Sequence, residues 1–91
     1  MIRNHMEVIE TDMKADLVQL SVAIAAQAQK YFITDQDKAR YIREECEGLF
    51  GPTWHCIVGE SFIASFSYEL EHFILLKYKK LFFMIFKCGY C

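Results

Sequence analysis

The sequence has few of the residues that interrupt regular structure. Its 91 residues include one proline and four glycines, whereas hydrophobic residues make up 54% of the chain. Such a composition is typical of a packed globule and excludes a disordered tail. A chain of this length has room for one hydrophobic core, so we expect a single domain that spans residues 1–91.

An excess of positive charge is also missing. Ten Lys and Arg residues face twelve Asp and Glu residues, which gives a formal net charge of −2. Proteins that contact the phosphates of nucleic acid usually carry a large basic surface. We therefore expect no nucleic-acid partner.

Long hydrophobic runs are absent as well. The longest uncharged apolar stretch in the last third, residues 81–86, has six residues, whereas a membrane-spanning helix needs about 20. Residues 1–13 carry charges throughout and lack the apolar centre of a secretory signal. The four cysteines are therefore expected to be free thiols in a reducing compartment. We expect a cytoplasmic protein without a transmembrane segment.

The first half of the chain predicts a short strand and two helices. Residues 6–11 are a candidate strand, and Asp12 is a candidate N-cap for a first helix. A second helix is expected to begin at Thr34 and to end at Gly51-Pro52. The apolar stripe of the first helix is Met13, Leu17, Leu20, Ile24, Ala28 and Tyr31, and that of the second is Ala39, Ile42, Cys46 and Leu49.

The second half of the chain changes to the two-residue period of strands. Trp54, Cys56 and Val58 fall on one side of a first strand, and His55 and Ile57 fall on the other. Further strands are expected at residues 62–67, 72–78 and 81–86, with a hairpin around Lys79-Lys80. Helices first and strands second predict an α+β fold, in which two helices pack on an antiparallel sheet.

The last strand, LFFMIF at residues 81–86, is apolar at every position. Such a strand is expected to be covered on both faces. The two helices can cover one face, and nothing else in the chain is left for the other, so the sheet of a second copy is the simplest cover. The pattern favours a homodimer with face-to-face sheets. The alternative is a monomer in which loops fold over an ordinary buried strand.

The stretch GPTWHCIVGESF, followed by HFI and ending in IFKCG, resembles the cytoplasmic dynein light chain family of small dimeric hub proteins. The resemblance extends without gaps from about Met13 to Gly89. It implies the α+β fold above, with the strand at residues 60–67 exchanged between the subunits of a homodimer. It also implies a non-catalytic light chain of the dynein motor complex, in the cytoplasm and associated with the cytoskeleton.

In this family an extended peptide joins the edge of the exchanged strand, so main-chain bonds supply affinity and side-chain pockets supply specificity. The implied partners are the dynein intermediate chain and other proteins with Thr-Gln-Thr-like motifs, which the dimer brings together in pairs. The implied groove residues are Phe62, Ile63, Ala64, Ser65, Phe66, Ser67 and Tyr68 on the strand, Phe73 and Leu75 on the floor, and Asp35 and Gln36 at the helix start of the other subunit.

The resemblance also implies a dimer interface that contains Trp54, His55, Ser61 and Phe62. If His55 lies near its symmetry mate, protonation would place two like charges in a partly buried seam, and the dimer would weaken as the pH falls. The alternative is an ordinary strand histidine with no such effect.

The chain departs from the family pattern at several groove positions. Ile63 stands where relatives usually have Gly, and Ser65, Leu75 and Lys77 stand where they have Tyr. Strand pairing uses the main chain and should survive, whereas the side-chain pockets change. The alternative function is therefore a divergent paralogue with the same scaffold, an altered or lost peptide groove, and a structural or membrane-associated role.

No pattern indicates catalysis. The sequence shows no nucleophile beside a base, no paired catalytic carboxylates and no glycine-rich phosphate loop. Cys88 and Cys91 form a C-x-x-C at the chain end, without further ligands at the spacing of a zinc site. We therefore expect no enzyme activity, no cofactor and no metal.

Overall fold

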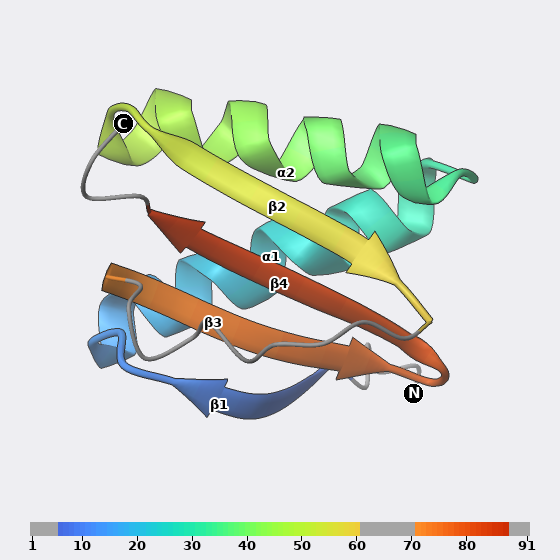
Figure 1. Cartoon of the computed structure of the whole chain (residues 1–91), viewed down its shortest axis with the longest axis horizontal. Coiled ribbons are helices and arrows are strands. Elements are labelled where there is room, and N and C mark those ends of the chain that lie inside the picture. The colour runs from blue at the N-terminus through green and yellow to red at the C-terminus, as the bar shows by residue number, and fades with distance from the viewer. Residues whose placement is uncertain (1–5, 61–70, 88–91) are drawn as a thin grey trace.

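The computed structural model describes residues 6–60 and 71–87. Four strands, β1 (Glu7–Thr11), β2 (Trp54–Gly59), β3 (Glu71–Tyr78) and β4 (Leu81–Lys87), form one antiparallel sheet in the order β1-β3-β4-β2. Helices α1 (Ala15–Tyr31) and α2 (Asp35–Phe50) cover one face of this sheet (Figure 1). The predicted α+β fold is confirmed. The strand expected at residues 62–67 lies outside the described residues.

The hairpin expected around Lys79 and Lys80 is present. Strands β3 and β4 pair from Tyr78 opposite Leu81 to Ile74 opposite Ile85. Lys79 takes the left-handed conformation, with φ at 56°, as tight turns between antiparallel strands require.

The start of α1 differs from the prediction, because Asp12 is not its N-cap. The helix begins at Ala15, and Lys14 at the N-cap position makes no side-chain cap bond. The Asp12 carboxylate instead accepts a 2.8 Å hydrogen bond from the Phe73 backbone N–H, and the Thr11 hydroxyl donates to the Phe73 carbonyl at 2.7 Å. These side chains connect the end of β1 to β3, a pairing distant in sequence that local pattern does not predict.

Both ends of α2 agree with the prediction. The Thr34 side-chain oxygen accepts a 3.1 Å hydrogen bond from the Asp37 N–H, which satisfies one free donor of the first turn. Gly51 follows the helix with φ at 83°, a conformation that glycine adopts without a steric penalty.

The main core lies between the helices and the sheet. Its cluster of buried residues comprises Met13, Ile24, Ala25, Ala28, Ile42, Cys46, Trp54, Ile74, Leu76, Phe83 and Ile85. The prediction of burial is wrong for three members of the expected stripes, because Leu20, Tyr31 and Leu49 are 43%, 67% and 56% exposed. On α1 the buried face is instead built largely from small residues, including Ser21 and Ala25, which a search for large apolar side chains misses.

Strand β4 is buried on both faces at its centre, as its sequence predicts. The consecutive residues Phe83, Met84 and Ile85 are all 0% exposed. Phe83 and Ile85 belong to the core cluster under the helices, so Met84 points to the opposite face. Met84 is buried in the single chain. The expectation that the chain has nothing to cover the face of the sheet away from the helices is therefore wrong at this position.

Candidate functional site

The free edge of β2 is the main candidate for an interaction surface. Among the described residues β2 pairs only with β4, which places β2 at the end of the sheet (Figure 1). The Trp54 backbone N–H donates to the Glu47 carboxylate of α2 at 3.2 Å, and it therefore points away from β4. Successive residues of an antiparallel strand point their backbone groups in opposite directions. Cys56 and Val58 consequently direct their N–H and C=O groups toward the free edge.

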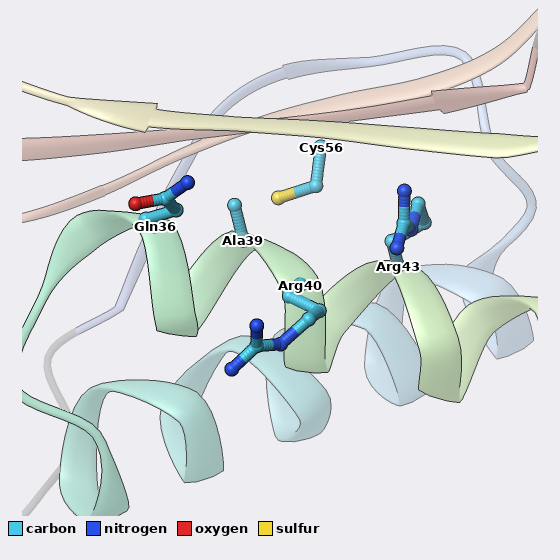
Figure 2. A pocket seen from close by; sticks show the side chains of 5 residues that line it. All are labelled: Gln36, Ala39, Arg40, Arg43 and Cys56. Atoms are coloured by element: carbon cyan, nitrogen blue, oxygen red, sulfur yellow. The ribbon is translucent and has the colours of Figure 1, made fainter.

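A pocket of about 250 Å³ lies between α2 and this edge of the sheet. Gln36, Ala39, Arg40 and Arg43 line it from α2, and Cys56 lines it from β2 (Figure 2). The Cys56 thiol extends toward the helix in this view. The Arg40 guanidinium is engaged at 2.9 Å by the Asp37 carboxylate. The pocket thus combines an amide, a guanidinium and an open strand edge, groups that suit an extended polypeptide.

Gln36 is among the predicted groove residues, whereas Arg40 and Arg43 are not. Ala39, Arg40 and Arg43 follow Gln36 at helical spacings of three, four and seven. The spacing of Gln36, Arg40 and Arg43 is a usable signal, because it places three polar side chains on one face of α2, next to the apolar stripe that includes Ala39.

Among the described residues, the chain by itself does not bring the predicted groove residues together. Gln36 lies in the pocket on the helix side of β2. Leu75 pairs with Met84 and lies between Ile74 and Leu76, both of which face the helices, so Leu75 lies on the opposite face of the sheet. Phe73 is buried outside the cluster under the helices. Phe62, Ile63, Ala64, Ser65, Phe66, Ser67 and Tyr68 lie outside the described residues, as does Ser61.

Trp54 and His55 point to opposite faces of the sheet. Trp54 is 2% exposed in the core and packs against Phe50, with ring centroids 5.4 Å apart. His55 is half-buried on the other face and stacks on Phe86 of β4 at 5.4 Å. The structure therefore places Trp54 in the interior of the chain and His55 on the face of the sheet away from the helices.

The environment of both described cysteines favours the protonated thiol. Burial, reinforced by the carboxylates of Glu45 and Glu47, raises the pKa of the Cys46 thiol to about 12. Burial also raises the pKa of Cys56, with a smaller contribution from Cys46. Both thiols are free and stay protonated at neutral pH. The C-x-x-C of Cys88 and Cys91 lies outside the described residues.

The described ranges contain neither a metal-binding cluster nor a membrane-spanning helix. Within residues 6–60 and 71–87, no three His, Cys, Asp or Glu side chains are grouped so that they could hold a metal ion. Neither of the helices described is long and apolar enough to cross a membrane.

Comparison with known proteins adds the family context. Residues 5–88 match the family described as dynein light chain type 1. The Caenorhabditis elegans protein named probable dynein light chain 2, cytoplasmic, is 42% identical over 90 residues, which cover 99% of this chain and 100% of that protein.

Solved structures support the fold. The dynein light chain-like domain of the Fasciola hepatica calcium binding protein FhCaBP2 superposes with a TM-score of 0.69 at 16% identity, covering 98% of this chain and 99% of that one. A mercury derivative of the same domain gives a TM-score of 0.68 at 17% identity, covering 97% and 96%. At this identity the likeness concerns the arrangement of helices and strands.

Proposed function

The chain belongs to the dynein light chain type 1 family, and from this premise we propose that it is a non-catalytic homodimeric hub of the dynein motor complex. The hub binds extended linear-motif peptides by strand addition and so joins its partners in pairs. The observation that carries the proposal is the free edge of β2, with the backbone groups of Cys56 and Val58 directed outward.

An unpaired strand edge in a folded protein is a template for another strand. In the proposed dimer, residues 60–67 of the second subunit pair with this edge, and each ladder hydrogen bond contributes about 1 kcal/mol. Twofold symmetry repeats the same pairing at the β2 edge of the second subunit. The half-buried His55 and the 38% exposed Ile57, both on the face away from the helices, provide further surface for the partner sheet.

The dimer would also complete the peptide groove. Gln36 and Leu75 lie on opposite faces of the sheet in one subunit, so they can line one groove only if they come from different subunits. A peptide would add to the outer edge of the exchanged strand and contact Asp35 and Gln36 at the start of α2. Two such grooves bind two peptide segments, and the linked partners gain avidity without new kinds of contact.

We propose cytoplasmic, cytoskeleton-associated localisation, with the dynein intermediate chain and other proteins carrying Thr-Gln-Thr-like motifs as partners. The similarity to a relative whose name includes "cytoplasmic" supports the location. Lys77 and Leu75 stand where the family pattern has aromatic residues, so the side-chain pockets of the groove differ, and strand addition by the main chain carries the binding.

Isothermal titration calorimetry with a Thr-Gln-Thr peptide tests the proposal on the full chain. We expect micromolar binding with one peptide per subunit. Ser65→Pro, which removes one ladder donor and places a ring at the edge, should abolish it, whereas the matched variant Ser65→Ala should bind as the wild type does. A dimer that binds no such peptide would instead favour the second candidate, a divergent paralogue that has kept the scaffold and lost the groove.

A further inference from the structure

A second pocket, distinct from the one beneath α2, lies at one end of the molecule. It has a volume of about 410 Å³ and contains Gln29, Asp35, Lys38, Glu60, Lys79 and Lys80 among its lining residues. These come from the end of α1, the start of α2, the end of β2 and the β3–β4 turn, which Figure 1 shows meeting at the same end of the fold.

Lys38 is the unusual member of this pocket, because it is 6% exposed. Its ammonium donates to the Gln29 side-chain oxygen at 2.8 Å. An ammonium group has three donors, and the amide oxygen is a neutral acceptor. Within residues 6–60 and 71–87 the single ion pair joins Arg40 to Asp37, so Lys38 has no acidic partner in that part of the chain. A buried charge is expensive without one, and the spare donors of Lys38 are suited to an anion.

The other charges of the pocket indicate which anion fits. Lys79 and Lys80 are exposed and add two positive charges, while Asp35 and Glu60 add two negative charges. With Lys38 the formal sum is three positive and two negative charges, or +1. A single carboxylate neutralises this sum, whereas a phosphate dianion would leave an excess of negative charge beside Asp35 and Glu60.

We infer that this pocket binds one carboxylate of an extended peptide, with the Lys38 ammonium as the anchor. The inference rests on the proposed peptide-binding function. Asp35 lines this pocket and the adjacent Gln36 lines the pocket beneath α2, so a peptide that runs past the start of α2 meets both. The carboxylate is either an acidic side chain flanking the paired segment or the free C-terminus of the peptide.

The experiment uses calorimetry on the full chain with twelve-residue peptides that share a central Thr-Gln-Thr. A single Glu is moved through the flanks and compared with Gln at each position, and the parent peptide is made with a C-terminal acid and with an amide. We expect one Glu position, or the free C-terminus, to raise affinity about tenfold through a charge-assisted hydrogen bond. Phosphoserine at the same position should give no larger gain than Glu.

Two variants assign the gain to the pocket. Lys38→Met retains an unbranched apolar stem and should abolish the gain while leaving the binding of the Gln peptides unchanged. Lys14→Met is the matched control, because Lys14 is exposed and makes no side-chain cap bond at the start of α1, and it should retain the gain. If Lys38→Met does not fold, the NMR shifts of the Lys38 ε-methylene protons, which should move with the Glu peptide only, provide the readout.

The possible outcomes separate the two hypotheses. Binding of the Gln peptides without a gain from any carboxylate would overturn the inference and leave the proposed function standing. A gain in affinity that persists in Lys38→Met, or that leaves the Lys38 resonances unmoved, would also overturn the inference. The aliphatic part of Lys38 would then pack in the fold while its ammonium group is hydrated and binds no carboxylate. Failure of every peptide to bind would refute the proposed function, and the inference would fall with it.

Discussion

Val58→Pro is expected to separate the proposed dimer without unfolding the chain. The Val58 N–H points toward the free edge of β2 and is not used in the pairing with β4, by the alternation that starts from the Trp54–Glu47 hydrogen bond. Proline is tolerated on an edge strand when the missing N–H faces outward. The substitution therefore removes a donor that only an added strand would use.

The size of the effect follows from symmetry. Each subunit loses one ladder hydrogen bond of about 1 kcal/mol, and a twofold dimer uses the same edge twice. The dimer is thus weakened by about 2 kcal/mol, which corresponds to roughly a 30-fold increase in the dissociation constant. The proline ring also crowds the incoming strand, so this figure is a lower estimate.

Sedimentation equilibrium over a range of protein concentrations measures the dissociation constant, and far-ultraviolet circular dichroism checks the fold. Val58→Ala is the matched control, because it also shortens the half-buried side chain but keeps the N–H. The reasoning is refuted if the proline variant remains folded and dimerises as tightly as the alanine variant does. Ile57→Pro should behave differently and unfold the chain, because its N–H points toward β4.

Three further outcomes test the fold and the thiols. Ile42→Ala should lower the free energy of unfolding by about 2–5 kcal/mol in urea at fixed protein concentration, because Ile42 is 0% exposed in the main core; a loss below about 1 kcal/mol would contradict that packing. Thr34→Ala should cost about 1 kcal/mol in the same assay through loss of the cap to Asp37, and Thr34→Ser, which keeps the hydroxyl, should restore most of it. Cys46 should resist iodoacetamide at pH 9 in the native protein and react in urea, as peptide mapping by mass spectrometry would show. Folding raises the pKa of Cys46 from its ordinary 9.0 to about 12. As the pH rises, the unfolded chain therefore loses the thiol proton before the folded chain does. The contribution of Cys46 to stability is thus present below pH 9 and declines between about pH 9 and 12.

The elements that the sequence predicts well are those with local causes. Thr34 and Gly51 bound α2 because a hydroxyl cap and a left-handed glycine act within one turn. The alternation of Trp54, Cys56 and Val58 identifies the face of β2 that packs under the helices, since the period of a strand is visible in six residues.

The features that the sequence does not predict depend on contacts between distant residues. Asp12 has the chemistry of an N-cap, but its carboxylate accepts from Phe73, 61 positions away. Leu20 and Leu49 fit an apolar period yet remain exposed, because the packing of each helix against distant residues decides which positions of the stripe are covered. Gln29 and Lys38 are nine residues apart on two helices, and nothing in their local pattern indicates that they meet in a pocket.

The candidate site likewise contains residues that the sequence places correctly and residues whose position depends on strand pairing. The sequence predicts Asp35 and Gln36 at a helix start, and they lie there. The face of the sheet on which Leu75 lies follows only from its pairing with Met84. The free edge of β2 follows from the sheet order β1-β3-β4-β2, and strand order is a property of the whole chain.

The bonds that Thr11 and Asp12 make to Phe73 bear on how such a dimer could come apart. They hold the beginning of β3 in place within its own subunit, while β2 is held through Gly59 by its ladder with β4. The chain is therefore anchored in its own sheet on either side of residues 60–67, the segment that the proposed dimer exchanges. The proposed dimer would then dissociate and form again while each four-stranded sheet keeps its own pairing.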